Sequence, residues 1–245
     1  YPVWNRFWAK VVLTEAIVAF GGAADGCMLD NASIVIASGT GKHAVVAPEM
    51  VAFGKRFGFR FLAHELGDAN RSAHVERRFD FIERNFYPGR TFVDLPDLNA
   101  QLRAWCTKVK STFRKRLGAR PMDLFVAEAA ALHPLPIHVP EVYQLHSRSV
   151  DESGYVNLSS NRYSVPSRLL DRRLSLHETK DRVRVFDGHR LVCEHLREEE
   201  GAGKTRMLDE HKLERKLARQ QVPKTTLRPE ELALSTSSPV MAAMV

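Results

Sequence analysis

The chain has 245 residues, of which 44% are hydrophobic and 27% charged, as expected for a soluble globular protein with one large domain or two smaller ones. It contains no run of 18 apolar residues, so we expect no membrane-spanning helix. The 36 Lys and Arg residues exceed the 29 Asp and Glu residues and give a net charge of +7, which favours a polyanionic partner because neutralised phosphates release counterions.

The cysteines and the first residues indicate the compartment. Cys27, Cys106 and Cys193 lie far apart and form no C-x-x-C pair, which argues against a zinc knuckle and for free thiols in a reducing compartment. The start, Y-P-V-W-N-R-F-W, has neither the basic and apolar segments of a signal peptide nor a starting Met. We therefore expect a cytoplasmic protein and interpret this start as the middle of a longer polypeptide.

The hydrophobic pattern of the first part of the sequence alternates between helices and strands. Gly21-Gly22 and a Pro at 48 mark the end of one expected helix and the start of the next. Residues 31–46 are expected to be loop-like, with a mobile loop at S-G-T-G-K, 38–42. Helices are predicted over 5–20, 48–57 and about 72–86, and strands over 27–29 and 59–63. This order indicates an α/β layer.

The second part of the sequence changes from helical to strand periodicity. The pattern over 95–132 is helical, and three prolines then interrupt it in a linker at 133–142. Alternating residues over 143–200, with a hairpin signal at Asp187-Gly188, predict a small antiparallel β-barrel. From Gly201 the chain is polar, with a solvated helix expected over 205–222 and disorder over 223–245.

Two stretches invite a phosphate-binding interpretation. S-G-T-G-K at 38–42 fails the spacing of a phosphate-binding loop, because Ile36 stands where the first Gly is required and His43 where Ser or Thr is required. Residues 103–120 contain seven Arg or Lys and no acid, whereas solvated helix faces usually mix both signs. This stretch predicts contacts with a nucleic-acid backbone. The best candidates are Lys108, Lys110, Arg114, Lys115 and Arg116.

Two acidic residues suggest a metal site. C-M-L-D-N at 27–31 ends a short apolar strand on Asp30, and H-V-E-R at 74–77 places Glu76 on the long helix. Asp30 alone is typical of a turn, and Glu76 alone of a surface salt bridge. Together they suit a hard divalent cation, because such cations take oxygen ligands and assist phosphodiester chemistry. Arg77, Arg78 and Arg84 on the same helix would then contact phosphates.

Several multi-residue motifs, in this order, resemble the IstA family of transposases of bacterial insertion sequences. The similarity runs from about Tyr1 to about His211. The motifs are D-N at 30–31, A-P-E-M-V-A-F-G-K-R-F-G-F at 47–59, G-D-A-N-R-S-A-H-V-E-R-R-F at 67–79, D-L-N at 97–99, P-L-P at 134–136 and G-Y-V-N-L-S-S-N-R-Y-S-V-P at 154–166.

The resemblance implies an α/β ribonuclease-H-like core of the integrase type. That core would lie in residues 1–94 without its N-terminal strands. It would be followed by a helical basic connector at 95–132, the linker at 133–142, a small β-barrel at 143–200 and a polar, largely disordered tail at 201–245.

The family uses Asp, Asp and Glu to bind Mg²⁺ or Mn²⁺, cuts DNA 3′ ends and joins them to target DNA. Asp30 matches the second acid and Glu76 the third. The resemblance also implies transposon ends and target DNA as substrates and the helper ATPase IstB as a partner. We further expect a homo-oligomer on DNA. Small barrels of this kind can carry further backbone contacts. The candidates there are Arg162, Arg168, Arg172 and Arg173.

The first acid of the family pattern is missing. It belongs on a first strand well upstream, but only 29 residues precede Asp30, and their acids are Glu15, within a helix, and Asp25, in a turn. The expected helix-turn-helix region is also missing. We therefore expect the C-terminal portion of a transposase, with little or no activity as an isolated chain.

Two other functions are weighed against this one. The basic helix and the barrel would also suit a non-catalytic module that binds DNA or interacts with an intact transposase. An unrelated α/β enzyme is the third hypothesis, with His64, His74 and the Ser38 region as a nucleophilic triad. It ranks far below the others because the sequence has no G-x-S-x-G.

Overall fold

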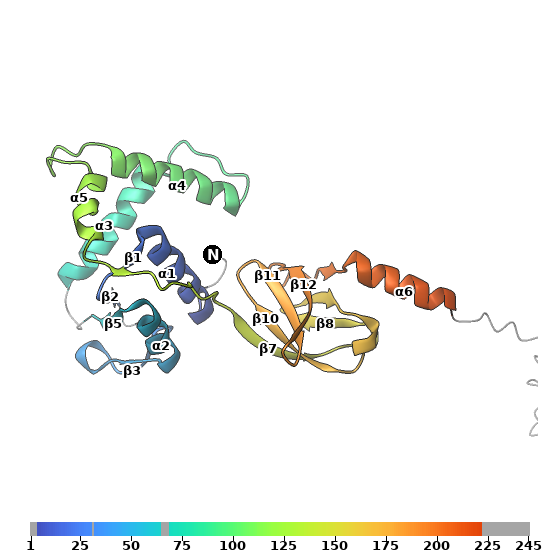
Figure 1. The fold of residues 1–245 in the computed structure, drawn as a ribbon. Helices are drawn as coiled ribbons and strands as arrows, with labels where there is room; N and C mark the ends of the chain where they lie inside the picture. The colour runs from blue at the N-terminus through green and yellow to red at the C-terminus, as the bar shows by residue number, and fades with distance from the viewer. Residues whose placement is uncertain (1–3, 31, 65–68, 222–245) are drawn as a thin grey trace, which may run out of the picture. The chain divides into compact units, whose positions relative to one another are not determined.

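The computed structural model describes residues 4–30, 32–64 and 69–221, with the backbone alone for 69–75, 219 and 221 (Figure 1). The tail over 223–245, expected to be disordered, lies outside the described residues. The chain divides into two compact units, with the boundary after Val142. None of the described helices is long and apolar enough to cross a lipid bilayer. Both helices and sheets are present, as the sequence predicts.

The N-terminal unit begins with helix α1 (Arg6–Phe20), close to its predicted range. The Asn5 side chain accepts a hydrogen bond from the Trp8 amide at 2.9 Å, which satisfies one of the free N–H groups at the start of the helix. At the other end, Gly21 adopts a left-handed conformation with a φ of 76°, which suits glycine.

Three two-stranded sheets follow α1. Strand β2 (Gly26–Leu29) pairs in parallel with β5 (Arg60–Ala63), while β1 (Gly22–Ala23) pairs with β6 (His133–Pro134) and β3 (Ile36–Ser38) with β4 (Val45–Val46), both antiparallel. The loop expected over 31–46 is therefore wrong in part, because this segment contains the β3–β4 pair and the 3₁₀ helix η1 (Gly41–His43). These elements are too short for a periodicity argument to detect.

Helix α2 (Pro48–Phe57) lies where the sequence predicts it and contributes Met50, Phe53 and Phe57 to the core of this unit. Its apolar side chains pack with β5 and α1 around the parallel strands. Gly54 permits this contact, because a Cβ at this position would lie 2.6 Å from the carbonyl oxygen of Phe59. The buried residues of this cluster are Ile17, Ala23, Val35, Ile36, Ala47, Met50, Phe53, Phe57, Phe59 and Phe61.

The rest of the unit is helical. Helix α3 (Ala69–Asn85) starts about three residues earlier than predicted. The helical pattern over 95–132 forms two helices, α4 (Leu95–Ser111) and α5 (Pro121–Ala129), rather than one run. Between them the Arg114 amide donates to the Ala119 carbonyl at 3.0 Å, and Gly118 has a φ of 63°. Pro121 then suits the first turn of the new helix.

The C-terminal unit contains two sheets over one core. The first has four antiparallel strands in the order β12–β11–β10–β7. The second pairs β8 with β9 antiparallel and β9 with β13 in parallel. The strands are β7 (Gln144–Ser149), β8 (Tyr155–Leu158), β9 (Asn161–Ser164), β10 (Arg173–Glu178), β11 (Arg182–Asp187), β12 (Arg190–Leu196) and β13 (Thr205–Arg206).

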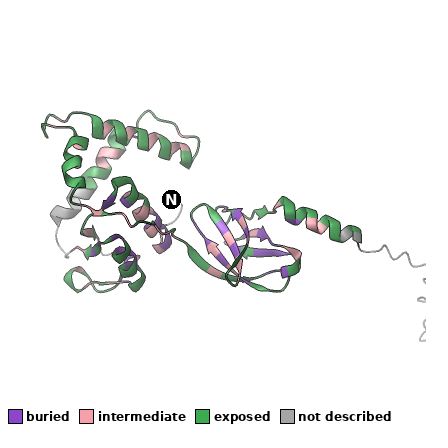
Figure 2. Ribbon diagram, in the orientation of Figure 1, coloured by how far each residue is buried: buried purple, intermediate pink, exposed green. Residues whose placement is uncertain are grey.

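Alternation along these strands was predicted correctly. Figure 2 shows the buried residues following the strands of this unit, and Leu174 and Leu176 of β10 alternate into the core as Val183 and Val185 of β11 do. The hairpin at Asp187-Gly188 is confirmed, with Asp187 opposite Arg190. The apolar core includes Val156, Leu158, Tyr163, Val165, Leu169, Leu174, Leu176, Val183 and Val185.

Two expectations for this unit need correction. The strands of the described residues form no closed barrel, because no ladder joins the four-stranded sheet to the three-stranded one. A period of two specifies which side chains face the core but not which edges pair. Nor are residues 201–221 a free polar tail: β13 extends the second sheet, and helix α6 (Asp209–Gln221) buries His211 against it.

Candidate nucleic-acid interface

Aromatic rings hold α3 and α4 together. The Trp105 ring of α4 lies 5.7 Å from the Phe81 ring of α3 and 5.5 Å from the Phe86 ring just beyond it. Phe86 is fully buried, and it also contacts Tyr87 and Phe92 in the connection between the helices. The Asp94 side chain then accepts from the Asp97 amide at 2.8 Å and caps the start of α4.

Two adjoining cavities lie along this helix pair, with volumes of about 640 Å³ and about 570 Å³. They share Phe81, Val109 and Arg114, and we call them together the α3–α4 groove. Cationic side chains line it, and among the described residues no Asp or Glu does. The cations are Arg77, Arg78, Arg90, Lys108, Arg114 and Arg116.

Two of the groove cations are held by aromatic rings. The Arg90 guanidinium lies 4.9 Å from the Phe86 ring centroid, and the Arg114 guanidinium 5.8 Å from that of Phe81. A ring face holds a guanidinium in place without neutralising it. Among the described side chains, no carboxylate pairs with Arg78, Lys108 or Arg116. Such a surface can bind a polyanion with little prior rearrangement of ion pairs.

The predicted cations of this unit fall into those that line the groove and those that do not. Five of the eight line the groove: Arg77, Arg78, Lys108, Arg114 and Arg116. Lys110 and Lys115 are exposed but do not line it. Arg84 pairs with Asp80 one turn earlier at 2.6 Å and does not line it either.

The sequence reasoning missed Arg90. It lies between the two helices, outside the basic stretch at 103–120, next to a Pro88-Gly89 turn signal. That turn brings the chain from α3 back to α4, and it was the feature of the sequence that could have indicated a position for Arg90 beside both helices.

The two candidate metal ligands are both exposed. Asp30 directly follows β2, and the His64 amide donates to the Leu29 carbonyl at 2.9 Å, so the parallel strands end side by side. Glu76 is exposed on α3. Among the side chains that the structure describes, no three His, Cys, Asp or Glu residues are arranged to hold a metal ion. A shared metal at Asp30 and Glu76 stays a prediction.

The four candidate arginines of the C-terminal unit have different surroundings. Arg162 pairs with Asp151 at 2.9 Å, and Arg172 pairs with Asp187 at 2.5 Å. The Arg173 Nε donates to the Ser147 hydroxyl at 2.9 Å. Arg168 is exposed on the 3₁₀ helix η2 (Ser167–Leu169). Two of the four are therefore already neutralised by carboxylates.

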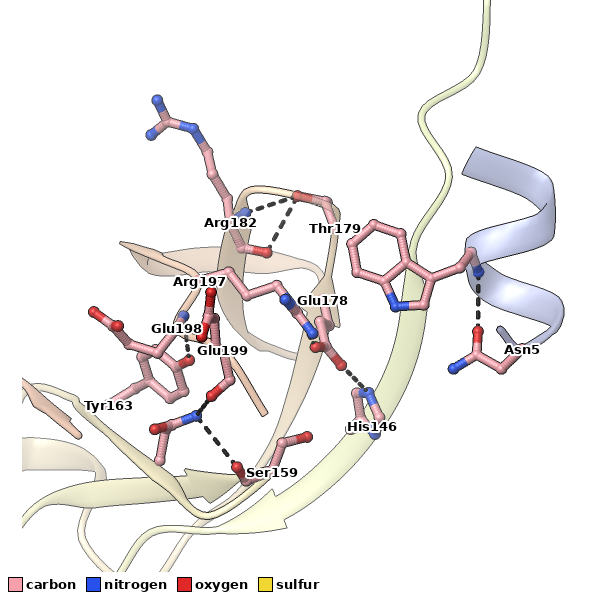
Figure 3. A network of polar contacts seen from close by, with 12 residues as sticks. Asn5, His146, Ser159, Tyr163, Glu178, Thr179, Arg182, Arg197, Glu198 and Glu199 are labelled. Carbon is pink, nitrogen blue, oxygen red and sulfur yellow. Dashed lines mark hydrogen bonds and ion pairs between the residues drawn. The ribbon is translucent and has the colours of Figure 1, made fainter. Parts of the chain in front are cut away.

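Buried polar groups tie this unit together (Figure 3). The buried Glu178 carboxylate receives the His146 Nε2 at 2.9 Å and the Arg197 Nε at 2.6 Å. The Glu198 amide donates to the Tyr163 hydroxyl oxygen at 3.1 Å. Such partners are necessary because an unpaired buried polar group is costly. In the described part of the chain, every buried side-chain N or O atom has a hydrogen-bond partner.

A second set of buried polar side chains, around Ser164, anchors α6 to the second sheet. Ser164 Oγ accepts from the Leu208 amide at 3.1 Å and lies 2.8 Å from His211 Nδ1. His195 Nε2 lies 2.8 Å from the Ser164 carbonyl oxygen. Burial lowers the pKa of both His195 and His211, which favours their neutral forms. Burial also raises the pKa of the Cys193 thiol to about 12, so it stays protonated.

Comparisons with known proteins show which class of proteins the chain is similar to. Residues 135–207 match the family model described as "Mu transposase, C-terminal domain". This range covers the strands of the C-terminal unit and ends just before α6. The chain is thus similar to transposases in the part that forms the two sheets.

Several insertion-sequence transposases are similar to a longer part of the chain. The transposase for IS232 of Bacillus thuringiensis subsp. berliner is 26% identical over 190 residues, which are 75% of this chain and 43% of that protein. The transposase for IS21 of Pseudomonas aeruginosa is 25% identical over 186 residues, 75% of this chain and 48% of that protein. A transposase of Aminobacter aminovorans is 30% identical over 187 residues, 75% of this chain and 36% of that protein.

The predicted resemblance to insertion-sequence transposases is therefore confirmed over about three quarters of the chain. The chain is similar to the IS21 and IS232 type in particular. It spans less than half of the length of these three relatives.

Proposed function

We propose that the chain acts in DNA transposition and holds the DNA backbone in the α3–α4 groove. The observation that carries this proposal is the collection of six cationic side chains in one groove of a chain similar to transposases, with no acid among the described residues that line it. Arg and Lys contacts with phosphates supply affinity without reading sequence. The groove would therefore position DNA, whereas recognition of transposon ends and of target would lie elsewhere.

We also propose that Asp30 and Glu76 belong to a ribonuclease-H-like phosphoryl-transfer site. In support, Asp30 lies at the carboxyl end of a parallel strand pair, the edge at which open α/β sheets place their ligands. Carboxylate oxygens are the donors that Mg²⁺ or Mn²⁺ takes, and the ion would supply Lewis-acid assistance for cutting DNA 3′ ends and transferring strands. The basic groove would hold the DNA that this site acts on.

The proposal for the isolated 245 residues is that they have little or no strand-transfer activity. Two carboxylates provide part of a ligand set, and paired-metal chemistry needs more. A homo-oligomer on DNA, the helper ATPase IstB and a cytoplasmic location belong to the same proposal. A cleavage assay on a transposon end with Mg²⁺ tests the activity. Efficient cutting by the purified chain, lost in Asp30→Asn, would show that these residues are sufficient.

A second candidate is a DNA-binding module without catalysis. The observation that favours it is that Asp30 and Glu76 are both exposed and take part in no three-residue ligand group among the described side chains, while the cations are assembled in one place. In that case the chain would bind DNA or join an intact transposase in mixed assemblies. Binding without any cleavage, also in the presence of an intact transposase, would identify this function.

The binding proposal is tested by removing three groove charges together. Arg78→Gln, Lys108→Gln and Arg116→Gln combined should weaken binding to all short duplexes alike. Three lost phosphate contacts should reduce the slope of log affinity against log salt by about 2.7. The control removes three exposed charges of the same unit outside the groove, with Lys42→Gln, Lys55→Gln and Arg56→Gln. An equal loss in both triple variants would mean that net charge, and not the groove, holds DNA.

A further inference from the structure

A second basic cavity lies in the C-terminal unit, between α6 and the β8–β9 hairpin. Its volume is about 1000 Å³, and we call it the α6 cleft. Four cations and one acid, Glu152, line it. The cations are Arg162, Lys212, Arg215 and Lys216. Lys212, Arg215 and Lys216 lie beyond the range that matches the transposase domain, so this cavity is a feature of α6 as well as of the sheets.

One tyrosine ring organises the inner wall of the cleft. The guanidinium carbon of Arg162 lies 4.5 Å from the Tyr155 ring centroid, and that of Arg215 lies 4.6 Å from it. Both guanidinium groups thus contact the same ring, and an anion beside them would interact favourably with the charge that remains. Asp151 neutralises Arg162, whereas the polar partner of Arg215 is the Gly154 carbonyl oxygen at 2.7 Å.

Gly154 is the residue that allows Arg215 to reach this position. Its φ is 74°, and a Cβ there would lie 2.7 Å from Arg215 Nη2. The side chain of Arg215 therefore lies directly over the backbone of the turn before β8. The Arg215 guanidinium consequently has a fixed place in the wall of the cleft, although no carboxylate pairs with it among the described residues.

The anchoring of α6 fixes the outer wall. His211 is buried against Ser164, and the Glu214 carboxylate accepts from the Ser167 amide at 3.2 Å. These contacts determine the rotation of α6 about its axis. Lys212 and Lys216, one helical turn apart, are exposed and line the cleft. Within the described residues neither lysine pairs with a carboxylate.

We propose that the α6 cleft is a second phosphate-binding site for DNA, separate from the α3–α4 groove, with Lys212, Arg215 and Lys216 as its contacts. This inference depends on the proposed DNA-binding function of the chain. A backbone with repeated phosphates satisfies cations from both walls at once, and a fixed guanidinium with two flexible ammonium groups suits oxygen ligands without reading bases. Leu170 and Met207 add apolar surface to the cleft, and Glu152 is the one acid among the described residues that line it.

The experiment compares two double variants of the full chain with a short duplex of arbitrary sequence. Lys212→Gln with Lys216→Gln removes two cleft charges at exposed helix positions, where the fold should tolerate them. Lys180→Gln with Arg190→Gln removes two exposed charges of the same unit outside the cleft. The salt slope should fall by about 1.8 in the first variant and stay close to the original value in the second.

A footprint gives an independent readout. Acetylation of lysine amines, followed by mass spectrometry, should show Lys212 and Lys216 protected by the duplex and Lys180 modified to the same extent with and without it. Equal modification of all three lysines, or an unchanged salt slope in the cleft variant, would overturn the inference. Protection by an acidic peptide but not by DNA would also overturn it.

The outcome separates this inference from the function on which it depends. If the groove triple variant loses DNA binding and the cleft variant does not, the function stands and the second site is wrong. If the cleft variant loses binding and the groove variant does not, the cleft is confirmed and the groove is the wrong site. Loss in neither variant would contradict both.

Discussion

The Ser164 hydroxyl provides a sharp test of how α6 is held. Ser164→Ala removes the partner of His211 Nδ1 and of the Leu208 amide, two contacts at 2.8 Å and 3.1 Å in a buried position. Leaving a buried polar group unsatisfied costs about 1–3 kcal/mol. With two groups affected, and Leu208 only partly buried, we expect α6 to lose about 2–4 kcal/mol of docking free energy.

Native-state hydrogen exchange measures this loss locally. The amides of α6 should exchange faster in Ser164→Ala by the factor that corresponds to 2–4 kcal/mol, about 30-fold to 800-fold. The amides of β10 and β11 should change less, because their ladder does not depend on α6. Ser175→Ala is the matched control, since Ser175 lies half-buried in β10 and no side-chain hydrogen bond involves it among the described residues. Unchanged protection of α6 in Ser164→Ala would refute the anchoring account.

Two further predictions concern pH and packing. Burial lowers the pKa of His195 and His211 below the ordinary value of about 6.5, so the unfolded state binds more protons as the pH falls below that value. The free energy of unfolding of the C-terminal unit should therefore reach its full value above about pH 7 and decrease below about pH 6.5, well before carboxylates titrate. A urea concentration at half-unfolding that does not change between about pH 7.5 and about pH 5.5 would contradict this. In the N-terminal unit, Gly54→Ala should destabilise α2 by about 1–3 kcal/mol, because its Cβ meets the Phe59 carbonyl oxygen, although Ala alone favours a helix by about 1 kcal/mol. A higher melting temperature of that variant would show that α2 can move away from β5.

Local patterns were sufficient where an element is set by its own sequence. Asn5 and Gly21 delimit α1, Pro48 starts α2, and both helices lie at their predicted positions. The Asp187-Gly188 hairpin is likewise specified by two adjacent residues. In each case the chemistry of a cap or a turn decides the structure without distant partners.

Features that depend on contacts between residues far apart in the sequence could not be predicted from local patterns. The polar residues 201–221 join the fold because Ser164, 47 residues before His211, offers a buried partner, and no local propensity contains that information. The barrel was wrong for the same kind of reason, since strand alternation does not determine which sheet edges meet. At the groove, five predicted cations come together, whereas Arg90 depends on the turn between α3 and α4.

The most direct test of the central claim is whether DNA covers the α3–α4 groove. Lys108 lines the groove, and Lys55 is exposed on α2 outside it. Acetylation of the wild-type chain with and without a short duplex, read by mass spectrometry, compares the two amines in one sample. The account predicts that DNA protects Lys108 and leaves Lys55 reactive. Equal reactivity of Lys108 with and without saturating DNA would contradict it.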